Sequence, residues 1–373
     1  MSMDIDQQKR RQSLKVIASE SIMVVAVVMT VIVLALIVSG YWLNSNFEVE
    51  RQGMLQISSV PTGADVEIDG ETAWLQRTNT SKVLPVGEHS VVLTKEGYDT
   101  WSKTINIAEG LLYRLHYPRL FIKDRTKEAI YDAIGTTTVY VSENNDKMLL
   151  FSGDTADLDI AKYSVPITDK SVDISTSVPE WILLELDTEK IEPKTVNLRT
   201  LYDFFRQDEK RSRDSINDFH LEQTLNGTEE LIFSKFYDDH YLTVLDETLV
   251  TVYKRDNAEP VSQSSLTFLP TGYHAGHNGE FITFFAGQQL ATLDMESLSV
   301  TEWTTKGTSF GWLDQDMIYS VKDGELFVYD YDGLNRRSIA TNVSERFPVF
   351  ITNDKWLYYF SDNNLIREWL IAR

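Results

Sequence analysis

A long apolar run near the N-terminus constrains this chain more than any other feature. From Ile22 to Val38 the only polar residue is Thr30, and the apolar and aromatic character continues to Leu43. A helix of about 20 such residues is long enough to cross the roughly 30 Å hydrocarbon core of a bilayer. A buried helix of a soluble protein is seldom apolar on every face over this length. The sequence therefore predicts a transmembrane signal-anchor helix over residues 22–43.

The basic residues around this run predict its orientation. Those that precede the run are Lys9, Arg10, Arg11 and Lys15. Only Arg51 lies close behind it, and cytoplasmic flanks carry the excess of Lys and Arg. We therefore expect a single-pass protein of the cell membrane, with residues 1–21 as a short cytoplasmic tail and the rest of the chain extracytoplasmic.

A cleaved signal peptide is the alternative interpretation of the same run. Val38 and Gly40 would then form a small-residue cleavage site. The apolar core of such a peptide is usually about 7–15 residues long, and this run is longer. The signal-anchor is therefore the preferred interpretation.

The chain is acidic and contains no cysteine. Its formal net charge of −21 disfavours nucleic acid as a partner, because phosphate binding needs clustered Lys and Arg. The same charge disfavours close binding to anionic lipid. The absence of Cys excludes disulfides, thiolate metal sites, a Cys nucleophile and a lipid-modified Cys.

Short alternating strands begin after a polar linker at residues 44–52. In residues 53–121 apolar positions alternate with polar ones, as at Leu55 and Ile57, and turn residues such as the Asp-Gly pair at 69–70 separate the runs. Alternation with a period of two is typical of strands that have one buried face. The region is therefore predicted to be a small β-sandwich.

Three motif pieces in this region resemble a PEGA domain. In chain order they are Val60-Pro61-Thr62-Gly63-Ala64-Asp65-Val66-Glu67-Ile68-Asp69-Gly70, Gly87-Glu88-His89 and Lys95-Glu96-Gly97-Tyr98. That family is named for a Pro-Glu-Gly-Ala motif and occurs in bacterial and archaeal surface-associated proteins, often beside a membrane anchor. This chain departs from the pattern twice: Thr62 replaces the Glu, and residues 73–77 replace the usual Gly-Thr-Pro. The resemblance implies a binding or spacer module and not a catalyst.

Residues 122–373 contain a diverged repeat in which a turn is followed by an aromatic or aliphatic strand. Its instances begin at Asn145, Asn226, Asn278, Leu313 and Asn353. A period near 40 residues with four short strands per unit is typical of a β-propeller, here with five or six blades. The unit at residues 317–337 is similar to blades of the TolB-like propeller family, and this resemblance implies a protein or peptide partner.

One charged segment interrupts the repeat. It runs from Leu198 to Phe219 and has some helical character. Two interpretations stay open: a solvated loop between blades, or an insertion that contacts a partner.

His274 and His277 are the first candidates for chemistry. Their spacing would allow two imidazoles to bind one metal ion, with Glu280 as the nearby carboxylate. They lie, however, at a Gly-rich turn without an adjacent Cys. We therefore expect an ordinary turn between strands and no metal site.

Two acidic clusters are the remaining candidates. Asp330-Tyr331-Asp332-Gly333 resembles the start of a calcium loop, but its twelfth position is Thr341 and not the bidentate Glu that such a loop needs. Asp238-Asp239-His240 is expected to be a hairpin loop. The sequence has no Gly-x-Ser-x-Gly elbow, phosphate-binding Gly loop or His-Glu-x-x-His motif. We therefore expect no catalytic, cofactor-binding or metal-binding residues, and no cofactor.

Together these features predict a mainly β protein with a transmembrane helix, a sandwich over residues 53–121 and a five- or six-bladed propeller over residues 122–373. The expected function is that of a membrane-anchored envelope protein that is not an enzyme. It would bind or scaffold a protein, peptide or cell-wall partner at the propeller face. An envelope hydrolase or lyase with its active site in the propeller funnel is the alternative. A signalling receptor is disfavoured because the short cytoplasmic tail cannot hold an output domain.

Overall fold

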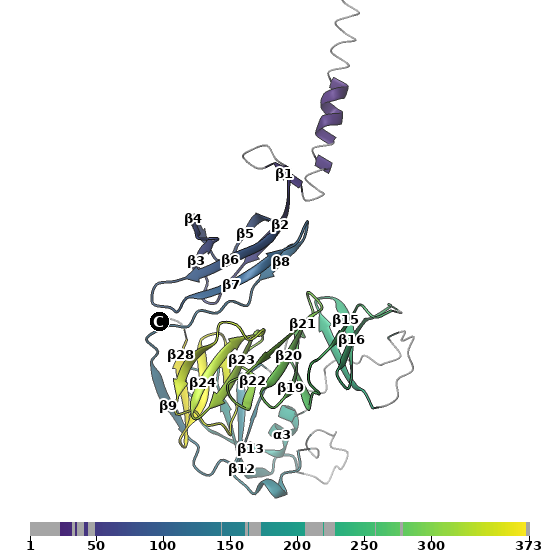
Figure 1. The fold of residues 1–373 in the computed structure, drawn as a ribbon. Coiled ribbons are helices and arrows are strands. Elements are labelled where there is room, and N and C mark those ends of the chain that lie inside the picture. Colours follow the sequence, from purple (N-terminus) through teal and green to yellow (C-terminus); the bar gives the residue numbers. More distant parts are fainter. Residues whose placement is uncertain are drawn as a thin grey trace, which may run out of the picture. The chain divides into compact units, whose positions relative to one another are not determined.

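The computed structural model confirms a mainly β protein (Figure 1). The residues that it describes are 23–31, 34–35, 41–43, 49–142, 144–160, 163, 173–205, 219, 228–257, 259–276 and 279–370. The chain divides into two compact units: unit 1 comprises residues 1–95 and 100–120, and unit 2 comprises residues 96–99 and 121–373.

The predicted transmembrane helix is wrong at its C-terminal end. Residues 23–31 and 34–35 are helical, but β1 (Tyr41–Leu43) is a strand that pairs with the start of β2 (Val49–Ile57). The predicted linker likewise gives way to strand at Val49. Pairing satisfies the backbone groups of both segments at once, which explains the extended conformation. Among the described residues, no helix is long and apolar enough to cross a membrane.

Unit 1 contains two four-stranded sheets. The first is built from β1, β2, β5 (Thr80–Pro85) and β8 (Leu112–Leu115), and β8 runs parallel to β2. The second has the order β4-β3-β6-β7, with β3 (Asp65–Ile68), β4 (Glu71–Arg77), β6 (Gly87–Thr94) and β7 (Trp101–Ile107).

The buried residues of unit 1 follow the predicted alternation. Leu55 and Ile57 of β2 are fully buried, and every second residue of β7 from Trp101 to Ile107 is buried. Asp69 and Gly70 both have positive φ, at 54° and 78°, and connect β3 to β4. Two successive residues in this region form the tight turn that the sequence predicts.

Unit 2 contains five four-stranded antiparallel sheets among its described residues. The first is β10 (Thr138–Val141), β11 (Lys147–Phe151), β12 (Ser177–Glu185) and β13 (Lys194–Asn197). The second is β14 (Glu230–Phe236), β15 (Asp239–Asp246), β16 (Leu249–Lys254) and β17 (Ser262–Ser265), and the third is β18 (Gly272–Ala275), β19 (Phe281–Ala286), β20 (Gln289–Asp294) and β21 (Ser299–Thr304). The fourth is β22 (Ser309–Trp312), β23 (Met317–Lys322), β24 (Glu325–Asp330) and β25 (Arg337–Thr341).

The fifth sheet joins the two ends of the unit. It consists of β26 (Phe350–Thr352), β27 (Trp356–Ser361), β28 (Asn364–Trp369) and, as its outer strand, β9 (Lys127–Asp132). Figure 1 shows the blue β9 beside the yellow β28. Successive four-stranded sheets whose last member is completed by the first strand have the topology of a β-propeller.

Apolar side chains pack neighbouring sheets together at four of the five junctions. Shared clusters join the second sheet to the third, the fourth to the fifth, and the fifth to the first. Stacked rings join the third sheet to the fourth, with Phe281 and Tyr331 centred 4.1 Å apart.

At the fifth junction the first and second sheets have separate clusters among the described residues. The first sheet packs against helix α3 (Leu198–Phe205), which buries Leu201 and Phe205. The second sheet packs against Phe219. The charged segment predicted between Leu198 and Phe219 therefore begins as a helix, and residues 206–218 lie outside the described part of the chain.

Candidate functional site

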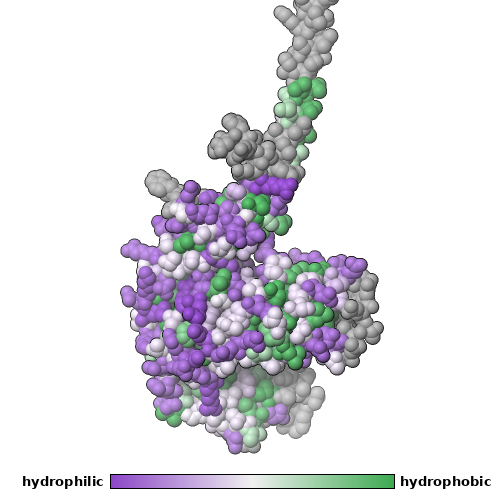
Figure 2. Space-filling view, viewed as in Figure 1, coloured by the Kyte–Doolittle hydropathy of each residue, from purple (hydrophilic) through white to green (hydrophobic). Residues whose placement is uncertain are grey.

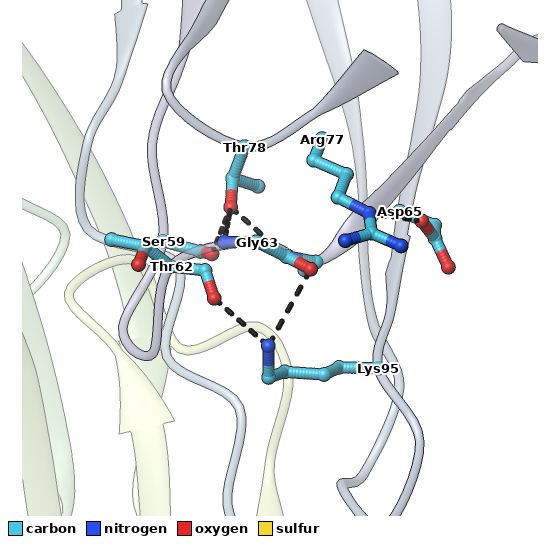
Figure 3. Close-up of polar contacts among 8 residues, drawn as sticks. Ser59, Thr62, Gly63, Asp65, Arg77, Thr78 and Lys95 are labelled. Atoms are coloured by element: carbon cyan, nitrogen blue, oxygen red, sulfur yellow. Dashed lines mark hydrogen bonds and ion pairs between the residues drawn. The ribbon is translucent and has the colours of Figure 1, made fainter. Parts of the chain in front are cut away.

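The loop at the start of the PEGA-like motif is held by one buried hydroxyl (Figure 3). The loop connects β2 to β3, and Thr78 lies just after β4. Thr78 Oγ1 accepts hydrogen bonds from the backbone N–H of Gly63 at 2.9 Å and of Ala64 at 3.1 Å. The hydroxyls of Ser59 and Thr78 share a further bond of 2.8 Å. One side chain thus satisfies two loop amides that β pairing leaves open.

A lysine holds the carbonyl side of the same loop. Lys95 Nζ donates to the carbonyl of Thr62 at 2.9 Å and lies 3.5 Å from that of Gly63. Figure 3 shows this ammonium group between the two oxygens. Asp65 and Arg77 form an ion pair of 3.4 Å beside the loop, and both side chains are exposed. The polar groups of the motif therefore fix the backbone of the turn.

A carboxylate–imidazole pair connects the first two pieces of the motif. Asp69 Oδ2 lies 2.6 Å from His89 Nδ1, and Asp69 Oδ1 accepts from the Ser90 N–H at 2.9 Å. His89 Nε2 lies 2.8 Å from the carbonyl oxygen of Pro85, which can only accept. Both ring nitrogens of His89 therefore face oxygen atoms. The His89 hydrogen bond, followed by the Ser90 N–H, lowers the pKa of Asp69.

His274 belongs to an aromatic cluster of unit 2. Its ring centre is 5.0 Å from that of Phe285 and 6.1 Å from that of Phe310. Burial lowers the pKa of His274, so the neutral imidazole is favoured in these surroundings. His277 lies outside the described residues, so the pairing of the two histidines stays untested.

The predicted acidic clusters lie in turns of unit 2. Asp330 is fully buried, and its Oδ2 accepts from Asn335 Nδ2 at 2.8 Å, inside the turn that joins β24 to β25. Asp239 begins β15 and pairs with Lys254 at 2.7 Å, so the cluster at 238–240 belongs to a hairpin as predicted. The Asp330 carboxylate therefore stabilises a turn, and the Asp239 carboxylate links two neighbouring strands.

A further group of acids gathers where the third and fourth sheets meet. Glu280 is buried, and one of its carboxylate oxygens lies within 4.8 Å of one from Asp316. Burial raises the pKa of Asp294, against hydrogen bonds from Ser297, and the Glu280 carboxylate adds to the rise.

Two buried charged residues of β28, Arg367 and Glu368, stabilise the fifth sheet. Neither was predicted from the sequence. Arg367 donates to Glu128 at 3.1 Å and to the carbonyls of Thr188 and Glu189 at 3.1 and 2.9 Å. It thereby links β28 to β9 and to the loop before β13.

On the other face of the same strand, Glu368 accepts a 2.8 Å bond from the Tyr359 hydroxyl and lies 3.4 Å from Arg125 Nε. Burial and the Glu368 carboxylate raise the pKa of Tyr359, which keeps this hydroxyl a donor. The only sequence signal for either residue is two adjacent charges between the apolar residues Leu365, Ile366 and Trp369.

A comparison of the sequence with protein families identifies the region that contains this motif. Residues 52–118 match the PEGA domain family. The PEGA region therefore contains the fixed loop, the Asp69–His89 pair and most of the two sheets of unit 1. No curated protein matches the sequence.

Three solved structures resemble the chain at low similarity. Hsv2 from Kluyvelomyces marxianus has a TM-score of 0.27 and 9% identity over 63% of this chain and 61% of its own. Hsv2p from Kluyveromyces lactis has a TM-score of 0.28 and 10% identity over 62% and 59%. The β-propeller domain of Myceliophteria thermophila Cps50 (Swd1) has a TM-score of 0.26 and 6% identity over 76% and 80%. The chain thus spans less than two thirds of either Hsv2 structure, and values this low support no functional conclusion.

Proposed function

We propose that this chain is a single-pass protein of the cell envelope that binds or scaffolds a protein, peptide or cell-wall partner without catalysis. Residues 1–21 would lie in the cytoplasm and the β-sheets of both units outside. The observation that carries the proposal is the combination of a PEGA region with five successive four-stranded sheets. Both kinds of module present surfaces built from loops on a rigid β scaffold.

The membrane anchor is supported by the apolar run at residues 22–38 and by the exposure of its described part. Every residue in 23–31 has an exposed side chain, including Met23 at 63% and Val31 at 59%. Exposed apolar side chains on all sides of a helix favour a lipid environment.

The absence of catalysis is supported by the roles of the candidate groups. Asp330 and Asp239 hold turns and strands, and His274 packs among rings. In the first four sheets of unit 2, the loops between the first and second strands and between the third and fourth lie at the same end of the strands. We assign the partner to this end, in agreement with the resemblance of residues 317–337 to TolB-like blades.

Anchoring is tested by washing and proteolysis of membranes that contain the full chain with a tag at each end. We expect the chain to stay with the membrane after alkaline carbonate treatment, and a variant lacking residues 1–43 to be released. Protease added outside sealed cells should remove the C-terminal tag and spare the N-terminal one. A full chain that washes off, or a protected C-terminal tag, would contradict the proposal.

Binding is tested with a photoreactive residue at Tyr237 or Leu334, which are exposed in loops at the same end of the strands. Thr301 on the outer strand β21 serves as the matched control position. We expect one adduct of reproducible mass from both loop positions in intact cells and none from the control. The adduct should diminish with added salt, because exposed charge pairs are screened over about 8–10 Å. The same adducts from all three positions would show that no face is selective.

A further inference from the structure

The outward face of the first sheet of unit 1 carries a row of exposed apolar side chains. Met54 of β2 lies directly opposite Val83 of β5 on one side and Leu112 of β8 on the other. Their exposed fractions are 44%, 50% and 38%. Val86 and Leu111, which lie just beyond the ends of β5 and β8, are also exposed, at 45% and 63%. We refer to these five residues as the outer apolar patch, and green areas are visible on unit 1 in Figure 2.

In the second sheet of the same unit, β6 and β7 show the opposite character on their outward face. Side chains alternate between the two faces of a strand, and the exposed positions of β6 and β7 are Glu88, Ser90, Thr94, Ser102, Thr104 and Asn106. The exposed apolar side chains of the first sheet therefore have no counterpart on β6 and β7. Apolar patches of this kind mark surfaces that meet a partner or a membrane.

Strand pairing places this patch close to the predicted anchor. The Val86 N–H donates to the carbonyl of Arg51 at 3.0 Å, and Arg51 pairs with Tyr41 across β1 and β2. Val86 is thus two strand spacings, or roughly 10 Å, from Tyr41. Tyr41 follows the apolar run that ends at Val38 by three residues, which span at most about 11 Å.

We propose that the outer apolar patch rests on the headgroup region of the bilayer that holds residues 22–38, an inference that depends on the proposed membrane anchor. The partner is a zwitterionic phospholipid surface, because the net charge of −21 disfavours anionic lipid. Five partly exposed side chains alone cannot supply the roughly 800 Å² per partner of a stable dimer. A tethered contact needs less area, because the anchor keeps the patch at high effective concentration beside the lipid.

The absence of Cys allows a single-site labelling test with the full chain in vesicles of phosphatidylcholine. A fluorophore is attached to Leu111→Cys or, as the matched control, to Thr104→Cys on the polar outward face of the second sheet. A fraction of the lipid carries a nitroxide on its headgroup and quenches fluorophores nearby. We expect at least twofold stronger quenching at residue 111 than at residue 104. In a Met54→Ser/Val83→Ser/Leu112→Ser background, quenching at residue 111 should fall to the control level.

The outcomes separate this inference from the anchor itself. Vesicle flotation of the same samples reports anchoring, and a chain that does not float contradicts the proposed function. A chain that floats but shows equal quenching at both positions overturns the lipid contact alone. A third measurement is energy transfer between copies labelled at residue 111. If this transfer persists when the protein is diluted in lipid, the patch contacts a second copy of the chain, and the proposed lipid contact is overturned.

Discussion

Thr78 holds the loop between β2 and β3 in place, although Thr78 itself lies outside that loop. Its buried hydroxyl accepts from two consecutive amides, those of Gly63 and Ala64, and contacts Ser59. Lys95 Nζ donates a hydrogen bond to the Thr62 carbonyl of the same turn. Amides and carbonyls that are fixed in this way lose their freedom to rearrange around a ligand. The loop is therefore better suited to presenting its outer surface than to closing over a small molecule.

Replacing Thr78 by Val should destabilise unit 1 by about 1–3 kcal/mol, because two buried N–H groups would lose their acceptor while the side-chain shape is kept. Thr78→Ser retains the oxygen and should lose less than half as much. Denaturant unfolding of the detergent-solubilised chain gives the free energies, and hydrogen exchange at Gly63 and Ala64 should accelerate in the Val variant alone. Unchanged exchange at both amides would show that the hydroxyl does not hold them.

Asp69 should make the stability of the PEGA region depend on pH. Its pKa in the fold is lowered, so the folded state favours the ionised form. The stabilisation is present above the unfolded pKa of about 3.9 and is lost as the pH falls through the lower folded value. Asp69→Asn should therefore be less stable than the parent at about pH 6, with a smaller difference at about pH 2.5. Asp65→Asn, which removes an exposed ion pair, is the control and should show little difference at either pH.

The sequence predicts the buried residues of this region but not the polar contacts. Leu55 and Ile57 follow a period of two, so local order in the chain is sufficient to place them. The contact from Gly63 to Thr78 joins residues 15 apart, and the one from Lys95 to Thr62 joins residues 33 apart. Neither contact has a local pattern, because the partners meet only after the strands have paired.

Among the elements, β9 and β28 determine whether the propeller closes. Their pairing joins residues such as Glu128 and Arg367, which are 239 apart in the chain. The guanidinium of Arg367 adds contacts to the loop before β13 and is almost fully buried. The Arg367 side chain therefore makes both the ion pair with β9 and the hydrogen bonds to the loop before β13.

Arg367→Leu should lower the free energy of unfolding of unit 2 by about 1–3 kcal/mol, because the carbonyls of Thr188 and Glu189 lose a charged donor. Arg367→Lys keeps the charge but cannot reproduce three contacts, and should recover only part of the loss. Lys194→Ala removes an exposed pair with Glu185 and should cost at most about 1 kcal/mol. Equal effects of Arg367→Leu and Lys194→Ala in chemical denaturation would argue against a special role for Arg367.

The repeat in the sequence corresponds to one strand position in most of the sheets. The instances after Asn145, Leu313 and Asn353 lead into β11, β23 and β27, each the second strand of its sheet. The instance at residues 226–233 instead leads into β14, a first strand. A turn followed by apolar residues has the same appearance before either strand, so periodicity gives the number of sheets better than the strand order.

At the scale of the molecule, the two compact units should unfold as separate transitions. Gly70 has φ of 78°, so Gly70→Val forces a β-branched residue into the left-handed region at a cost of about 1–3 kcal/mol. Calorimetry of this variant should show only the transition of unit 1 moving to lower temperature. Arg367→Leu should move only the other transition. A single transition that both variants shift would mean that the units unfold together.

Because β9 completes the fifth sheet, this sheet cannot form during synthesis until the ribosome has also made β28. At about 5–20 residues per second, Arg367 is added roughly 12–48 s after Glu128. Throughout that interval the edge of β9 that β28 will cover remains open to any other strand within reach. A ribosome that stops before Asn364 would release a chain with most of its sheets and no means of closing them. Closure of the fifth sheet therefore waits for the synthesis of β28.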